Sequence, residues 1–458
     1  KIITVDEAVS LIKDNDHVII SSFGNFSVCK SLLMGLKRSY LENKKPNNLT
    51  IITSVGSGNL TYEDEGLNII AEVGLVKHIV TSHLGMCKKM AELVGSNYVS
   101  SYMMPLGVYL DLLDSMIRKK DGVISKIGLN TFCDPRISDN KFTKVVEVDN
   151  QEYLYYKGFS VDVCFVKAKF CDKFGNISIK KDEIINDILE VVMVGKRYGA
   201  KVIVEVDEIV DKIEVDDIYI PAILVDYVVI SEYKEKVIIK NREIKASRLK
   251  CATRAYMETS YNDVINIGVG MPDIISDLII KDNNKKNLTV TVESGVIGGK
   301  IGLGEYFGSS SGYDYKIRMN DMLKLYNSNF LDVAFLGAAQ IDKFGNVNVS
   351  KFKNRTVGAG GFIDIISNAK KIVFLTTLVT KNNEAKFVDK VEEITFASKN
   401  ALLNNQDVLY ITDICVFKLT NNGLELIEVD NDVDINNDIL KYIEFDVKVS
   451  NCLKGEKR

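Results

Sequence analysis

Residues 162–178 read DVCFVKAKFCDKFGNIS, and residues 332–348 read DVAFLGAAQIDKFGNVN. Nine of these 17 positions are identical, and the second copy lies 170 residues after the first (172 to 342). In each copy, Asp-Lys-Phe-Gly-Asn has the composition of a tight hairpin turn flanked by β-branched residues. A repeat on this scale indicates two related structural units in one chain.

Two further pairs of segments occur in the same order along the chain. Residues 48–56 (NLTIITSVG) parallel residues 287–295 (NLTVTVESG), with four of nine positions identical. Residues 16–24 parallel residues 263–270 more weakly, each being a short β-rich run that ends in glycine. The spacing between matching segments falls from 239 residues (48 to 287) to 170 residues (172 to 342) along the chain. The first half therefore has the longer middle segment.

Short β-branched runs alternate with amphipathic segments throughout the chain. Residues 4–7 (TVDE) form a capping box that predicts a helix start, and His17–Ile20 predicts a strand. Strands separated by helices are typical of an α/β fold with largely parallel sheets. We expect two duplicated open α/β domains packed face to face, residues 1–240 and 241–458, joined by the charged stretch Glu232–Lys250. A cleft between such domains is a favoured ligand site.

Composition excludes several classes of partner. The 458-residue chain has a net charge of −4 and no basic stripe, so we expect no nucleic-acid partner. The longest apolar run, Ile218–Ile230, contains Pro221 and Asp226 and is too short to span a bilayer, so we expect no membrane partner. The eight cysteines include no C-x-x-C pair, which indicates a reducing, cytoplasmic compartment.

Motifs for metal and cofactor chemistry are missing from the sequence. The three histidines, His17, His78 and His83, are scattered, and we interpret each as structural. The sequence contains no H-E-x-x-H, no Walker loop, and no G-x-G-x-x-G followed by an acid. We therefore expect neither a metal site nor a prosthetic group.

The repeat singles out Glu293. At equivalent strand ends the first half has Ser54 and the second has Glu293. Ligands bind at the carboxyl ends of strands in open α/β sheets. A carboxylate there could be a nucleophile, a general base or a metal ligand, whereas the alternative is a solvated or helix-capping side chain. Small residues that allow close backbone approach follow it: Ser294, Gly295, Gly298 and Gly299.

Two glycine-rich segments are candidate anion sites. Residues 358–362 (GAGGF) could form a nest of backbone N–H groups, and the alternative is a packing turn. Residues 268–272 (GVGMP) follow the predicted strand Val264–Ile267 and precede the predicted helix Asp273–Ile280. A helix N-terminus beside a glycine turn attracts phosphate or carboxylate groups. Pro272 suits the first position of that helix.

Taken together, these motifs resemble class I coenzyme A transferases of the acetate/propionate and 3-ketoacid branch. The resemblance rests on residues 293–299, 358–362 and 268–272, and on residues 128–136 (GLNTFCDPR), similar to the family's Gly-x-x-Thr-Phe-x-Asp-Pro-Arg. It spans nearly the whole chain. It implies that coenzyme A moves from a short-chain acyl-CoA to a carboxylic acid, with the thioester as substrate rather than as cofactor. It also implies a homodimer or homotetramer.

The resemblance assigns roles within the two halves. Glu293 is the nucleophile, already ionised at pH 7, that forms an acyl-glutamyl anhydride and then a glutamyl-CoA thioester. The N–H of Gly360 or Gly361 stabilises the oxyanion. The second half holds the glutamate and the CoA-binding glycines, and the first half lines the acyl or carboxylate pocket. The expected substrate-binding residues are Gly268, Gly270, Met271, Ser294, Gly295, Gly298, Gly299, Gly358, Ala359, Phe362, Asn25 and Leu106.

The chain departs from the family pattern at two of these positions. Leu106 stands where the family commonly has a glutamine that donates to the oxyanion. The loop at Asn25 lacks the family's glycine and proline, and Asn25 or a water is the expected substitute donor. We expect Leu106→Gln to raise turnover. The alternatives are a catalytically impaired paralogue that binds CoA or acyl-CoA, and an acyl-CoA hydrolase.

Overall fold

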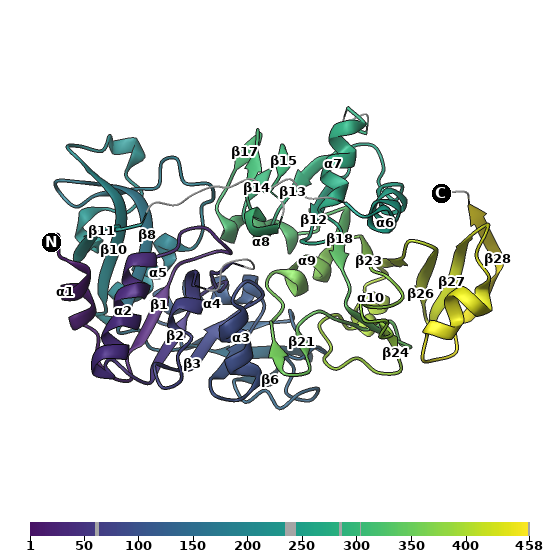
Figure 1. Cartoon of the computed structure of the whole chain (residues 1–458), viewed down its shortest axis with the longest axis horizontal. Coiled ribbons are helices and arrows are strands. Elements are labelled where there is room, and N and C mark those ends of the chain that lie inside the picture. The colour runs from purple at the N-terminus through teal and green to yellow at the C-terminus, as the bar shows by residue number, and fades with distance from the viewer. Residues whose placement is uncertain (60–63, 234–243, 284–285, 303, 457–458) are drawn as a thin grey trace.

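The computed structural model describes residues 1–458 except 60–63, 234–243, 284–285, 303 and 457–458. Its two large sheets lie side by side along the long axis of the molecule, with the N-terminal half on the left of Figure 1 and the C-terminal half on the right. In the described residues, no helix is long and apolar enough to cross a membrane.

The main path of the first sheet is parallel from edge to edge, and one further short strand, Ile177–Ser178, pairs antiparallel with it. Its strands are β1 (His17–Ile20), β2 (Leu49–Ile52), β3 (Val76–Thr81), β4 (Ser100–Met103), β8 (Val163–Asp172), β10 (Lys201–Val210) and β11 (Tyr227–Ile230). Their order is β11-β10-β8-β1-β2-β3-β4, and every neighbouring pair is parallel. The central strands are runs of buried Val, Ile and Leu, as expected for a parallel sheet covered on both faces.

The second sheet has a parallel centre, antiparallel strands on both sides of it, and a parallel pair of strands at one edge. Its strands are β12 (Val264–Ile267), β13 (Thr289–Thr291), β14 (Val296–Ile297), β17 (Tyr315–Lys316), β18 (Val333–Gly337), β23 (Lys371–Leu375), β25 (Asp407–Ile411), β26 (Cys415–Thr420), β27 (Gly423–Asp430) and β28 (Lys448–Glu456). The order is β17-β14-β13-β12-β18-β23-β25-β26-β27-β28, with β13 to β25 parallel. The predicted α/β fold with largely parallel sheets is confirmed.

The repeated turn takes the same form in both halves. Asp172 Oδ1 accepts from the N–H groups of Phe174 and Asn176, each at 2.9 Å. Asp342 Oδ1 does the same for residues 344 and 346 at 3.0 Å. The first turn joins β8 to β9 (Ile177–Ser178), and the second joins β19 (Gln340–Asp342) to β20 (Val347–Asn348), both antiparallel. The predicted hairpins are therefore confirmed.

The remaining strands form smaller sheets. They are formed by β5 (Gly122–Ser125), β6 (Thr143–Val148) and β7 (Gln151–Lys157), by β15 (Lys300–Ile301) with β16 (Ser310–Ser311), by β21 (Lys351–Phe352) with β22 (Arg355–Thr356), and by β24 (Phe387–Val388) beside β19.

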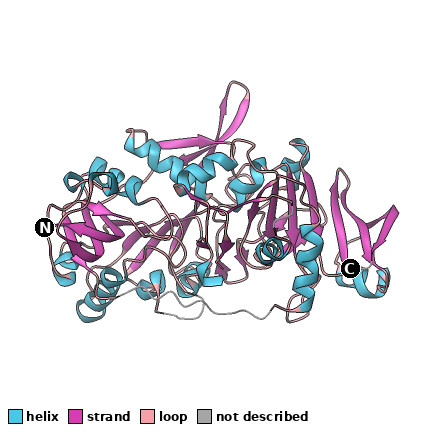
Figure 2. Cartoon of the chain, turned by 90° about the horizontal axis from the view of Figure 1, so that it is seen from above, coloured by secondary structure: helices cyan, strands magenta, loops and turns pink. Residues whose placement is uncertain are grey.

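The helices cover the sheets (Figure 2). They are α1 (Val5–Ser10), α2 (Lys30–Asn43), α3 (Lys88–Gly95), α4 (Leu106–Ile117), α5 (Ile188–Tyr198), α6 (Ala246–Tyr256), α7 (Ile274–Lys281), α8 (Met319–Tyr326), α9 (Phe362–Asn368) and α10 (Ser398–Leu403). The capping box at Thr4 is present, because the Thr4 and Glu7 side chains each bond the other's backbone. The predicted helix Asp273–Ile280 is α7, in which Asp273 is the N-cap. Pro272 therefore precedes the cap and does not occupy the first helical position.

The predicted join is shorter than Glu232–Lys250 at its C-terminal end, because α6 already begins at Ala246. Residues 234–243 of the join lie outside the described residues. The two halves pack through helices, with α4 of the first against α8 and α9 of the second. Backbone hydrogen bonds also cross between them, from Leu84 N–H to Val357 O (2.6 Å) and from Leu106 N–H to Gly360 O (3.0 Å). One hydrophobic core is continuous across this contact.

Candidate active site

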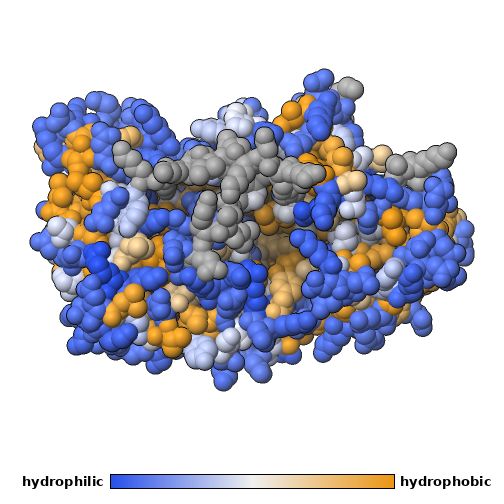
Figure 3. All heavy atoms as spheres, in the orientation of Figure 1, coloured by the Kyte–Doolittle hydropathy of each residue, from blue (hydrophilic) through white to orange (hydrophobic). Residues whose placement is uncertain are grey.

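A cavity of about 350 Å³ lies at the carboxyl ends of the parallel strands of the second sheet. In the space-filling view, hydrophobic atoms are visible in a hollow of the surface between the two halves (Figure 3). Of the residues expected from the sequence, the cavity is lined by Glu293, Gly268, Gly270, Met271, Gly358, Ala359, Gly360 and Phe362. Segments up to 94 residues apart (268 to 362) therefore meet at one site.

Glu293 follows β13 by two residues, and its half-buried carboxylate lies against Gly361. A Cβ atom on residue 361 would overlap Glu293 Oε2. Burial raises the pKa of Glu293 to about 7, although the hydrogen bond from the Gly361 backbone acts in the opposite direction. A pKa raised toward 7 lowers the ionised fraction of this carboxyl at neutral pH below that of a solvated glutamate.

The two glycines of the expected oxyanion site differ in their hydrogen bonds. The N–H of Gly360 donates to Ser82 O at 2.9 Å, so this donor is already engaged. The N–H of Gly361 is the one that faces the Glu293 carboxylate. Gly360 has a φ of +59°, a left-handed conformation that glycine adopts without strain. The structure therefore favours Gly361 over Gly360 as the donor.

Leu106 does not occupy the position expected of a substrate-binding side chain. It is the first residue of α4, its side chain is completely buried, and its N–H donates to Gly360 O. The next N–H, that of Gly107, donates to Asp364 Oδ2 at 2.9 Å. The N-terminus of α4, in the first half, thus contacts the glycine segment 358–362 of the second half. Leu106 makes this contact through its backbone N–H.

Asn25 also lies outside the cavity lining. It sits in a turn closed by hydrogen bonds between the backbones of Phe23 and Phe26. This turn contacts the second half, because the Phe23 ring packs against Gly308 so closely that a Cβ atom on residue 308 would overlap it. Phe307, next to Gly308, lines the cavity. The loop therefore supports the cavity wall.

The residues after Glu293 serve packing. The Ser294 hydroxyl donates to Gly308 O at 2.5 Å, and a Cβ on Gly295 would overlap Ile317 O. A Cβ on Gly298 or Gly299 would likewise overlap neighbouring atoms of residues 310–314. None of these four residues lines the cavity. Their small size lets the loop after the glutamate fold back closely on residues 308–318.

Several cavity residues were not expected from the sequence. His83 was interpreted as structural, yet it lines the cavity and its Nδ1 lies 3.2 Å from Gly358 O, while burial lowers its pKa. Arg248 and Lys386 also line it, and burial and then Arg248 lower the pKa of Lys386. The sequence carries no signal for these residues, since they come from loops and from a helix of the join.

Asn266 is the exception that the sequence could have revealed. It is a polar residue in the otherwise apolar strand β12, directly before the glycine turn. Among the described residues, no group of three or more His, Cys, Asp or Glu side chains is placed to hold a metal ion.

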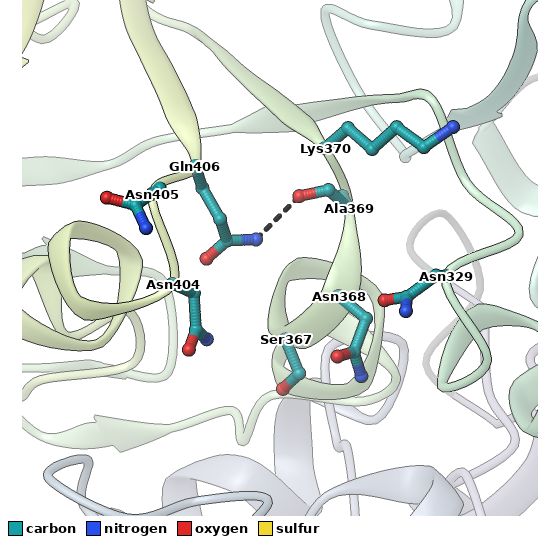
Figure 4. A pocket seen from close by; sticks show the side chains of 8 residues that line it. All are labelled: Asn329, Ser367, Asn368, Ala369, Lys370, Asn404, Asn405 and Gln406. Atoms are coloured by element: carbon teal, nitrogen blue, oxygen red, sulfur yellow. Dashed lines mark hydrogen bonds between the residues drawn. The ribbon is translucent and has the colours of Figure 1, made fainter.

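A second cavity lies at the amino ends of the strands of the same sheet, opposite the Glu293 cavity. The residues that line it lie between α8 and β18, at the end of α9, and before β23 and β25 (Figure 4), and they are Asn329, Ser367, Asn368, Ala369, Lys370, Asn404, Asn405 and Gln406. The Gln406 amide donates to Ala369 O at 2.6 Å and to Ile366 O at 2.8 Å. It thereby caps the end of α9. This cavity adjoins the amino ends of the strands, away from Glu293.

Comparison with known proteins agrees with the geometry of the glutamate site. The coenzyme A transferase family profile matches residues 2–231 and 251–437. The chain is 32% identical to caffeate CoA-transferase of Acetobacterium woodii, covering 99% of this chain and 96% of that protein. It is also 32% identical to acetate CoA-transferase YdiF of Escherichia coli strain K12, covering 99% and 93%.

The fold matches a solved structure over its whole length. The acyl-CoA transferase YdiF of Escherichia coli O157:H7, in a thioester complex with CoA, superimposes with a TM-score of 0.92 at 30% identity, covering 100% of this chain and 95% of that one. Profile, sequence and fold agree over both halves. The chain therefore belongs to the coenzyme A transferase family and is an enzyme that transfers coenzyme A.

Proposed function

We propose that this enzyme moves coenzyme A from a short-chain acyl-CoA to a carboxylic acid through covalent intermediates on Glu293. A Glu293 oxygen attacks the thioester carbonyl carbon, the C–S bond breaks, and CoA leaves as a thiolate from an acyl-glutamyl anhydride. The thiolate then attacks the glutamyl carbonyl, and the acyl group leaves as a carboxylate. The resulting glutamyl-CoA thioester passes CoA to the acceptor acid by the same steps in reverse.

The observation that carries this proposal is the placement of a half-buried carboxylate in a largely apolar cavity, against one backbone N–H. The environment that raises the pKa of Glu293 also makes its ionised form more basic and more nucleophilic than a solvated carboxylate. The Gly361 N–H supplies an oxyanion donor, a contribution worth about 10²–10³ in rate at such sites. The largely apolar lining of the cavity also limits the water around the anhydride.

The residues that line the cavity support different substrate-binding roles for the two halves of the chain. Among the lining residues that the structure describes, Val55 and His83 come from residues 1–240 and the others from residues 241–458. We assign the CoA thioester to the second half, including the glycines of residues 268–270 and 358–360, and the acyl or acid group to the first. Arg248 and Lys386 line the cavity and would attract the phosphates of CoA, because both are cationic side chains.

The test is mass spectrometry of the full-length enzyme after incubation with acetyl-CoA alone. We expect CoA to be attached to Glu293, and Glu293→Gln to abolish the adduct and lower turnover by about 10³-fold or more. The control Glu208→Gln changes an exposed glutamate on β10 and should behave as wild type. An unmodified Glu293 in an active enzyme would contradict the proposal.

The same experiment separates the two alternatives. Free CoA released without an acceptor acid would identify a hydrolase, in which water intercepts the anhydride. Adduct formation without transfer to any acid would identify an impaired paralogue.

We also infer a cytoplasmic location and a homodimeric or homotetrameric assembly. Seven of the eight cysteines are buried, which fits a protein that does not depend on disulfide bonds. Light scattering of the purified enzyme measures the assembly, and a monomer would contradict it.

A further inference from the structure

We propose that Asn266 binds the pantetheine arm of the CoA thioester by accepting a hydrogen bond from its amide N–H nearest the sulfur, and that Tyr326 is the positioning residue for Asn266. This inference rests on the proposed function of Glu293. It assigns a ligand contact to Asn266 and a positioning role to Tyr326, two residues that the sequence motifs do not single out.

A directed chain of hydrogen bonds orients the Asn266 amide. Thr291 Oγ1 donates a hydrogen bond to the carbonyl oxygen of Ile265 at 2.8 Å, because a carbonyl oxygen can only accept. Thr291 therefore receives the proton of the Tyr326 hydroxyl, at 2.9 Å. The tyrosine oxygen in turn accepts from Asn266 Nδ2 at 3.0 Å. The nitrogen of the amide is thereby committed to Tyr326, and the oxygen is turned away from it.

The oxygen of that amide has no partner within the described part of the chain. Asn266 is only 1% exposed, and its Oδ1 is buried and without a hydrogen bond. A buried acceptor left unmatched costs free energy, and native proteins seldom keep one without a use. Asn266 also lines the Glu293 cavity. The Asn266 oxygen can thus accept a hydrogen bond from a substrate that binds in the Glu293 cavity.

The sheet register places this acceptor beside the nucleophile. Asn266 on β12 pairs with Thr291 on β13, and Glu293 follows Thr291 by two residues. Glu293 lies in the turn directly after β13 and lines the same cavity as Asn266. In agreement, the Glu293 carboxylate is among the groups that raise the pKa of Tyr326, after burial, the larger cause.

The chemistry of the substrates identifies the donor. An acyl group and an ionised acid offer no N–H or O–H at the reacting end, whereas the pantetheine arm carries a secondary amide N–H two carbons from the sulfur. The Glu293 carboxylate does not serve as this donor in its ionised form, the form that attacks the thioester, because an ionised carboxylate can only accept. An acceptor held beside Glu293 would therefore fix the position of the thioester sulfur.

The experiment compares acetyl-CoA with its analogue in which an ester oxygen replaces that amide nitrogen. We expect wild type to prefer the amide by about tenfold in kcat/KM, the effect of one hydrogen bond to a buried group. Asn266→Ala should reduce the preference to less than about twofold. Tyr326→Phe keeps the ring but removes the hydroxyl that orients the Asn266 amide, and should weaken the preference for the amide substrate.

Asn327→Ala is the matched control, since its Oδ1 is also buried without a partner but lies outside the cavity. It should keep the tenfold preference. The inference is overturned if Asn266→Ala discriminates amide from ester as wild type does. Covalent labelling of wild-type Glu293 by acetyl-CoA separates this failure from failure of the proposed function, because labelling does not depend on the preference.

Discussion

The carboxylate of Glu293 lies so close to Gly361 that a Cβ atom there would overlap Oε2 and come within 3.2 Å of Cδ. Gly361 has φ −81° and ψ 1°, a conformation open to any residue. Glycine is therefore required at this position by the close approach of the Glu293 carboxylate and not by the backbone conformation.

Gly361→Ala should lower turnover by about 10²–10³-fold, because the methyl group displaces the carboxylate from its oxyanion donor. Steady-state kinetics measure the loss, and an unchanged melting temperature verifies that the fold is retained. Turnover near the wild-type level would show that the glutamate reacts from another position.

The rate should depend on the ionisation of Glu293. Its pKa is raised to about 7, and only the deprotonated form is nucleophilic. We expect kcat/KM for acyl-CoA to fall as pH drops below about 7 and to level above it. The pH profile of the initial rate tests this, and a flat profile from pH 5.5 to 8 would contradict it.

Leu106→Gln should lower turnover, the reverse of the expectation from the family pattern. The Leu106 side chain is completely buried, so a glutamine amide there would have to be buried or would distort the start of α4. An unmatched buried amide costs about 1–3 kcal/mol. Leu106→Met, of similar volume and without an amide, is the control and should retain activity and melting temperature. Higher turnover in the glutamine variant would show that the side chain reaches the cavity.

Asp364→Asn should flatten the pH dependence of stability. Burial raises the pKa of Asp364 to about 8, so the wild-type fold is favoured at low pH and loses stability as pH rises from the unfolded value near 4 through 8. Asparagine can still accept from the Gly107 N–H and does not ionise. Melting temperatures between pH 5 and 8 should therefore fall less in this variant. An equal fall in both proteins would mean that Asp364 is ionised in the folded state.

Lys386→Met should raise KM for acyl-CoA by about tenfold and leave KM for the acceptor acid unchanged, because a charge-assisted contact to phosphate is lost. Lys386 lines the cavity, whereas Lys390 is exposed outside it. Lys390→Met is thus the control for the change of net charge. An unchanged KM for acyl-CoA in Lys386→Met would remove this residue from the CoA site.

The sequence by itself determined the duplicated α/β fold and the position of the glutamate. The repeat, the hairpin turns and the strand His17–Ile20 are local patterns, and the structure has them where they were predicted. Glu293 was found because a strand end and the glycines after it are readable along the chain.

Only the tertiary structure decided which neighbours serve that glutamate. Gly361 rather than Gly360 faces it, Leu106 acts through its backbone, and Asn266 is oriented through Tyr326, 60 residues away (266 to 326). These relations depend on strand register and on the contact between the halves. Sequence patterns report which face a residue presents, but hydrogen bonds between distant segments form only when the packed core brings them together.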